Sequence, residues 1–133
     1  MLKIKTELAT QKGKPLDQMI EKEIFRRQGK IAFRGLGKRR SVFLTKYLEA
    51  TARQKRSSHT RRKRCFFAGL EVIQNARSGD LVMNKETQYG MSYEYHGLTP
   101  EGIVVTVHIR EEMEGKDKKL FLISTFEGKK MGG

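Results

Sequence analysis

The spacing of apolar residues predicts a helix early in the chain. Pro15 is suited to a first helical turn, where the N–H group that proline lacks has no partner, and Gly29 is suited to a helix end. Between these residues, apolar side chains recur every three or four positions: Leu16, Met19, Ile20 and Ile24. We therefore predict a helix over 15–28.

The same helical spacing recurs in two later segments of the chain. Ser41 is a plausible cap for a helix over about 41–55, whose apolar face consists of Leu44, Tyr47, Leu48, Thr51 and Ala52. A third helix ends at Gly79 and buries a stripe of Phe66, Leu70, Ile73 and Ala76. Gly69 within this stripe would allow close packing against a neighbour, although glycine weakens a helix by about 1 kcal/mol relative to alanine.

After Gly79 the period of apolar residues changes to two, which is typical of strands. Four segments show this period: 81–84, 91–96, 103–110 and 120–126. The connections between them are short and contain Gly, Pro or Asp, which favours an antiparallel meander. Near the start of the chain, Leu2 and Ile4 alternate with lysines and predict a short strand or an extended arm, and Ile31 and Phe33 indicate another brief extended piece.

The order of these elements predicts an α+β fold in a single domain over 1–133. About three basic N-terminal helices pack on one face of a C-terminal four-stranded antiparallel sheet. The other face of the sheet is expected to stay open and to present side chains.

Charge divides the chain at residue 64. Residues 1–64 contain twenty Lys or Arg and five Asp or Glu, a balance of +15, whereas residues 65–133 have a balance of −2. With a sequence pI of about 10.1, this segregation indicates a polyanionic partner, and nucleic acid is the first candidate. The basic half lacks the apolar face of an interfacial helix, and no apolar run reaches the length of a membrane span, so we expect no membrane partner.

The densest charge lies in residues 53–64, hereafter the basic segment, where seven of twelve residues are Lys or Arg. A second basic cluster surrounds Gly35 and Gly37, whose backbone could hold a phosphate at the start of a helix or could form a flexible basic loop. The cations of both clusters are the predicted nucleic-acid contacts: Arg34, Lys38, Arg39, Arg40, Arg53, Lys55, Arg56, Arg61, Arg62, Lys63 and Arg64. His59 lies among them as a phosphate contact, a bystander or a catalytic residue.

The predicted strand 103–110 places candidate chemistry on the open face. Its odd-numbered residues, from Ile103 to Ile109, are all apolar and should face the helices, so that His108 and Arg110 lie together on the other face. Histidine can remove or donate a proton near neutral pH, and arginine binds phosphate. Metal-independent cleavage of RNA uses both functions, and it requires the 2′-hydroxyl that DNA lacks. The alternative is an ordinary solvated pair. Ser124 or Thr125 would lie near the pair, depending on strand register. His96 lies on the neighbouring strand, whose Tyr93 and Tyr95 are candidates for the core or for base stacking.

Four segments within 57–126 carry a family resemblance: His59–Arg64, Gly69–Gly79, Val104–His108 and Leu122–Thr125. In this order they resemble the small bacterial and phage nucleases of the barnase–EndoU–colicin–RelE superfamily. The resemblance implies a helix bearing His and Arg, then a second helix and an antiparallel sheet of three or four strands. It implies catalytic roles for His59, Arg62 and Thr125. The family's helix is amphipathic, whereas this segment is almost purely basic, which shifts the expected chemistry towards His108 and Arg110.

Three functions remain open on these observations. The first is a metal-independent endoribonuclease, with His108, Arg110, His59 and Thr125 as the catalytic candidates. The second is a nucleic-acid-binding protein without catalysis, with RNA favoured over DNA, and the third is a factor that binds an acidic protein partner. The single cysteine, Cys65, has no disulfide partner, and the Cys and His spacing of zinc sites is absent. We therefore expect a reducing, cytoplasmic environment, no metal and no cofactor.

Overall fold

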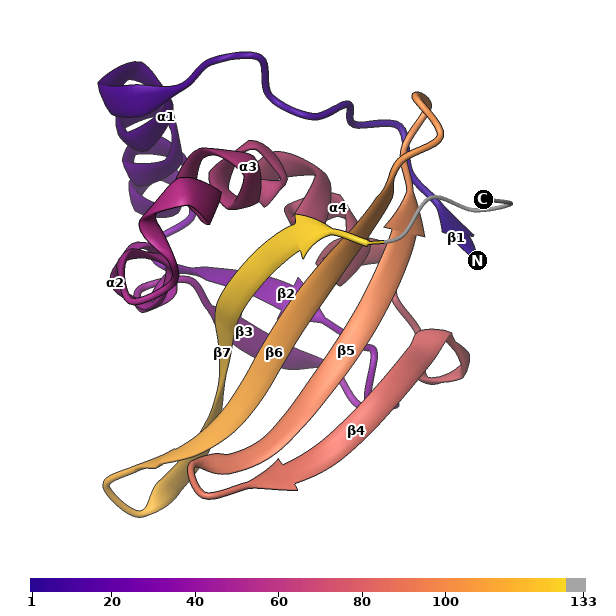
Figure 1. Ribbon diagram of the computed structural model, residues 1–133. Helices are drawn as coiled ribbons and strands as arrows, with labels where there is room; N and C mark the ends of the chain where they lie inside the picture. The colour runs from indigo at the N-terminus through magenta and orange to yellow at the C-terminus, as the bar shows by residue number, and fades with distance from the viewer. Residues whose placement is uncertain (129–133) are drawn as a thin grey trace.

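A computed structural model describes residues 1–128, and its helices and strands are interspersed along the chain (Figure 1). The strands are β1 (Leu2–Lys3), β2 (Lys30–Phe33), β3 (Arg40–Phe43), β4 (Leu81–Thr87), β5 (Gly90–Leu98), β6 (Val104–Glu114) and β7 (Asp117–Glu127). The helices are α1 (Gly13–Arg26), α2 (Tyr47–Ala52), α3 (His59–Arg64) and α4 (Phe66–Asn75), with short 3₁₀ turns at Arg56–Ser58 and Ser78–Asp80. The fold is thus α+β, but its helices do not form an N-terminal block.

The predicted four-stranded antiparallel sheet is wrong, because seven strands form one mixed sheet. Its order is β1-β5-β6-β7-β3-β2, with β4 paired to β5 beside β1. The four strands expected after Gly79 are present as β4 to β7, and neighbours among them pair antiparallel. The N-terminal strands extend this sheet at both edges, since β1 runs parallel to β5 and β3 runs parallel to β7.

The predicted helix over 41–55 is also partly wrong, because its first residues form β3. Val42 and Leu44 are both fully buried and flank the half-buried Phe43, which is the alternation of a strand. Val42 pairs with Ile31 of β2 on one side and with Leu120 of β7 on the other. The preceding glycine loop is therefore a hairpin connection, and the helix start that was expected to hold a phosphate there is absent.

The long strands bend so that β2 and β3 lie behind them in Figure 1. The end of β2 packs against β5, where the ring of Phe33 lies edge-on to Tyr95 and the Tyr95 hydroxyl donates to the carbonyl oxygen of Gly35 at 2.6 Å. We call the side of β5, β6 and β7 that faces α4 and the β2–β3 hairpin the inner face, and the opposite side the outer face.

The inner face holds the core. Val107 and Ile109 of β6 are fully buried there, together with apolar side chains from both halves of the chain. Gly69 brings α4 close to β7, since a Cβ atom at this glycine would lie only 2.7 Å from the Thr125 side chain. The close packing expected at Gly69 is therefore confirmed, and burial of this face fixes the position of the whole sheet.

Helices α2 and α3 cover the edge of β7 beyond the point where β3 stops pairing at Phe121. From this edge they send side chains to both faces of the sheet. Tyr47 of α2 reaches the inner face, where its hydroxyl lies 2.6 Å from Thr125 Oγ1, whereas Arg62 of α3 lies over the ring of Phe126 on the outer face. The basic segment is thereby placed beside the outer face. Among the residues described, no helix has both the length and the apolar character needed to cross a membrane.

Candidate functional site on the outer face of the sheet

The outer face gathers the ionisable side chains of neighbouring strands. Pairing sets Glu94 of β5 directly opposite His108 of β6, and His108 opposite Ser124 of β7. His96 and Arg110 are each two residues from one member of the Glu94–His108 pair, so they share its face. Sequence reasoning placed His108 and Arg110 on one face with His96 on the neighbouring strand, and the structure puts His96 on that same face and adds Glu94.

Glu94 and the two histidines form a compact cluster. The Nε2 atom of His96 lies 3.1 Å from Glu94 Oε2, and both side chains are about three-quarters covered. His96 and His108 are diagonal neighbours on adjacent strands. The backbone positions of such a pair are about 7 Å apart.

A pocket of about 220 Å³ opens beside this cluster. It is lined by Glu94, His108 and Phe126, with side chains of β4 forming the far wall. Ser92 also lines the pocket, and its Oγ atom is buried without a hydrogen-bond partner among the described residues. A buried hydroxyl without a partner favours a polar ligand at this place.

The environment of His108 favours its neutral form. Burial lowers the pKa of this imidazole, the positive charge of Arg110 lowers it further, and the carboxylate of Glu94 opposes both effects. His108 is therefore held unprotonated at neutral pH, with a nitrogen lone pair available as a base.

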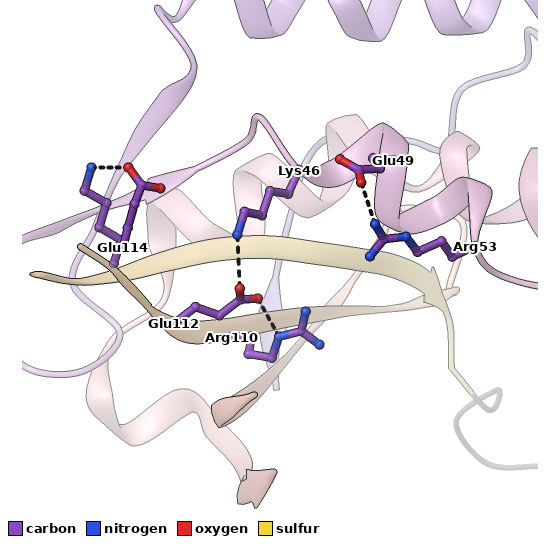
Figure 2. Close-up of polar contacts among 7 residues, drawn as sticks. Lys46, Glu49, Arg53, Arg110, Glu112 and Glu114 are labelled. Atoms are coloured by element: carbon purple, nitrogen blue, oxygen red, sulfur yellow. Dashed lines mark hydrogen bonds and ion pairs between the residues drawn. The ribbon is translucent and has the colours of Figure 1, made fainter. Parts of the chain in front are cut away.

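A second pocket, of about 430 Å³, adjoins the first along β6 and is lined by cations. Lys46 and Arg53, which flank α2, and Arg110 of β6 contribute to it, together with Glu112 and Tyr89. Figure 2 shows the Glu112 carboxylate between two of these cations, with Lys46 Nζ 3.0 Å away and Arg110 Nε 2.7 Å away. Burial opposes ionisation of Glu112, but the hydrogen bonds from Arg110 and Lys46 outweigh it and lower the pKa of the carboxyl group.

Thr125, the third catalytic residue implied by the family resemblance, does not join this site. A bulge at Ile123 shifts the register of β7, so Ser124 rather than Thr125 faces His108. The Thr125 hydroxyl is fully buried on the inner face, where it is bonded to Tyr47 and donates to the carbonyl oxygen of Arg62 at 2.8 Å. Both of its hydrogen-bonding functions are therefore used within the fold.

His59 begins α3 and is occupied by a backbone contact. Its Nε2 atom lies 2.7 Å from the carbonyl oxygen of Gln54, a bond that ties α3 to the end of α2. His108 lies instead in the pocket beside β4, so the structure does not bring the two histidines into one cluster. Arg62, three residues after His59, does reach the site through its contact with Phe126.

The basic segment divides into an exposed part and a part that holds the fold together. Arg53, Lys55, Arg56 and Arg61 are exposed. By contrast, Lys63 pairs with Asp17 of α1 at 2.9 Å, and the Arg64 guanidinium donates to the carbonyl oxygen of Ala9. Part of the charge run therefore secures the N-terminal arm and α1 to α3.

The cations of the β2–β3 loop lie away from the outer face. Arg34, Lys38 and Arg39 are exposed, but the loop that carries them packs through Gly35 against Tyr95 on the inner face. Arg40 is paired with Glu111 at 2.8 Å. These four residues form no continuous surface with His108.

Two other candidates are part of the core. Tyr95 is fully buried, and burial raises its pKa well above the usual range. Burial likewise raises the pKa of the Cys65 thiol to about 12, so this thiol is not a nucleophile at neutral pH. Within residues 1–128, no group of three or more His, Cys, Asp or Glu side chains is arranged to hold a metal ion.

A pocket larger than these two lies elsewhere on the described chain. It measures about 740 Å³ between α1 and α2, is mainly apolar, and is bordered by Phe25, which is 86% exposed. It contains none of the predicted catalytic residues. The ionisable cluster rather than cavity size therefore defines the candidate site.

Comparisons with known proteins identify no relative for this arrangement. No protein-family model, no curated protein and no solved structure matches the chain significantly. The function must therefore be argued from the site itself.

Proposed function

We propose that the protein binds RNA along the outer face of its sheet and cleaves it there without a metal ion. The observation that carries this proposal is the cluster of Glu94, His96 and His108 beside Arg110, on adjacent strands and next to an open pocket. It supplies a base, an acid and a cation at one place, which is the set of groups that cleavage by the 2′-hydroxyl needs.

The lowered pKa of His108 and its place in the pocket support a role as the base. Its neutral imidazole accepts the proton of the 2′-hydroxyl, and the 2′-oxygen attacks phosphorus. His96, held by the Glu94 carboxylate, donates a proton to the departing 5′-oxygen as the P–O5′ bond breaks. Arg110 stabilises the extra negative charge of the phosphorane, and the products are a 2′,3′-cyclic phosphate and a 5′-hydroxyl.

Binding would rest on cations and aromatic rings that border the same face. Among the described residues, Arg53 forms an ion pair with Glu49, four residues earlier. Because about two-thirds or more of each side chain is exposed, this ion pair is weak, and an RNA phosphate could replace the Glu49 carboxylate at little cost. The Phe126 ring under Arg62 and the Tyr89 ring, 60% exposed, offer surfaces for stacking of bases.

Incubation of purified protein with labelled RNA in EDTA tests the proposal. We expect fragments that end in a 2′,3′-cyclic phosphate, and no cleavage of the same RNA when every 2′-hydroxyl is methylated. Binding of the methylated RNA should weaken linearly with the logarithm of salt concentration. Intact RNA with salt-dependent binding would refute cleavage alone. Intact RNA without such binding would refute the whole proposal and leave an acidic protein as the partner of the charged half.

A further inference from the structure

In the pocket beside Arg110, a carboxylate of the protein occupies the cations that could bind an RNA phosphate. Glu112 accepts hydrogen bonds from Lys46, which precedes α2, and from Arg110 on its own strand. All three side chains are partly covered, with 18% of the Glu112 side chain exposed. Carboxylate and phosphate oxygens take the same donors in the same geometry, so Glu112 occupies a ready-made anion site.

The two cations are held in place by contacts that do not involve Glu112. Lys46 Nζ lies 4.0 Å from the centre of the Phe121 ring, and the Arg110 guanidinium lies 4.8 Å from the centre of the Tyr89 ring. Such contacts stabilise a cation over an aromatic face. Withdrawal of the carboxylate would therefore leave both donors positioned around the pocket.

A neighbouring ion pair shows that this arrangement is not general on the hairpin. Two residues further along β6, Glu114 pairs with Lys119 alone at 2.8 Å, and its side chain is 54% exposed (Figure 2). Glu114 lines no part of the cation-lined pocket. It carries the same charge on the same strand, so it provides a matched control.

We propose that this pocket is a phosphate subsite for RNA, and that Glu112 fills it as an internal competitor until an RNA phosphodiester displaces the carboxylate. The inference rests on the proposed RNA binding and assigns it a second contact point. Arg110 lies two residues from His108, about 6.7 Å along a strand, and its guanidinium group has five N–H donors. It can therefore serve the phosphate being cleaved and, through the Nε donor that Glu112 now occupies, a neighbouring phosphate in the subsite. Glu112 thereby weakens binding and excludes ligands that cannot supply a competing phosphate.

The test is the affinity for 2′-O-methyl RNA, which binds without being cut, measured by fluorescence anisotropy over a series of salt concentrations. Glu112→Gln should bind about 5-fold more tightly than the wild type, with a salt slope steeper by about 0.7 for each additional phosphate contact. Glu114→Gln, which makes the same change in net charge, should alter affinity less than about 2-fold. The double variant Lys46→Met/Glu112→Gln should lose most of the gain.

The outcomes separate this inference from the proposed function. A wild-type protein without salt-dependent RNA binding refutes the proposed function. A wild type that binds, with Glu112→Gln equal to Glu114→Gln or weaker than the wild type, refutes the subsite. Thermal unfolding of each variant shows whether it is folded, and a gain in affinity cannot arise from unfolding. If Glu112→Gln binds inorganic phosphate more tightly but RNA no more tightly, the pocket takes a small anion and its assignment to RNA is overturned.

Discussion

The two faces of β6 differ most around His108, where apolar and ionisable residues alternate along the strand. On the inner face, Val107 and Ile109 are fully buried against α4 and the rest of the core. On the outer face, His108, Arg110 and Glu112 meet other charged side chains beside two pockets. The inner face thus contributes the core, and the outer face carries the proposed site.

The difference also shows that the chemical type of a residue does not define its role. Thr125 and Ser124 are adjacent hydroxyl residues on β7, yet the first is bonded within the core and the second faces His108. A single bulge determines which of them can serve a site.

The largest effect should come from replacing His108 on the outer face. His108→Ala removes the proposed base and should reduce RNA cleavage by about 10²-fold to 10⁴-fold. The measurement is the initial rate of cyclic-phosphate formation in EDTA. Thermal unfolding should change little, because the side chain is only partly buried and lies outside the inner core.

Glu94→Gln provides the matched test within the same cluster. It preserves the size of the side chain but removes the charge that holds His96, so the rate should also fall. A rate unchanged in both variants would place the chemistry elsewhere and would leave the outer face as a binding surface.

On the inner face, Ile109→Ala should act through stability instead. Ile109 is fully buried between two site residues, and truncation of a buried isoleucine costs about 2–5 kcal/mol of unfolding free energy. Chemical denaturation measures the loss. Ile109→Val, which removes one methylene group, should cost about 0.5–1.5 kcal/mol and leave the cleavage rate of folded protein unchanged. Full stability of Ile109→Ala would contradict the assignment of the inner face as the core.

Thr125→Val tests whether this residue is structural or catalytic. The change keeps the shape of the side chain but breaks its bonds with Tyr47 and with the Arg62 carbonyl. The Tyr47 hydroxyl still donates to the Arg62 carbonyl oxygen at 3.2 Å, so no buried group is left without a partner, and the change should cost about 0.5–1.5 kcal/mol of unfolding free energy for each lost hydrogen bond. The rate per folded molecule should be retained. A loss of rate similar to that of His108→Ala, with unchanged stability, would support the role that the family resemblance implies.

These contrasts define what the sequence could predict. The alternation of 103–110 was sufficient to place His108 and Arg110 on one face. Every second residue from Ile103 to Ile109 is apolar and β-branched, which is typical of the side of a strand that faces a core. The alternation of residues 120–126 was not sufficient to place Ser124 and Thr125 on the correct faces. Strict alternation from the buried Leu122 would put Ser124 on the inner face and Thr125 on the outer face. The bulge at Ile123 reverses this order, and it became visible only in the pairing of β7 with β6.

The missed strand β3 has a similar explanation. Residues 40–43 are too short for a clear period, and their pairing with β7 joins parts of the chain that are far apart in sequence. Glu94 was missed because it alternates with two tyrosines and was read only as the polar side of a strand. Its significance depends on lying opposite His108, which required the register of β5 and β6. Glu112 lies beyond the predicted strand 103–110, whereas β6 continues through it.

The basic segment should also contain residues of two kinds, some that bind RNA and some that stabilise the fold. Arg53→Gln/Arg56→Gln removes exposed cations and should weaken RNA binding about 2-fold to 5-fold, with a shallower salt slope and unchanged unfolding. Lys63→Gln/Arg64→Gln removes an equal charge but breaks the contacts with Asp17 and Ala9, so it should lower stability. Equal effects of both variants on binding, with no loss of stability in the second, would show that the whole segment acts as one charged surface.

The smallest expected effect is a change in the pH dependence of stability caused by His108. Its pKa in the folded protein is lowered from the ordinary value, chiefly by burial, so the unfolded chain binds more protons than the folded one as pH falls below about 6.5. The wild type should therefore lose stability between that pH and the lowered pKa, while no such loss from this residue arises at higher pH. His108→Gln, which cannot titrate, should lose less stability over the same interval, as measured by denaturant midpoints at a series of pH values. Parallel curves for the two proteins would mean that His108 is as solvated when folded as when unfolded, and the outer face would then lack the partly dry pocket on which its role as a base depends.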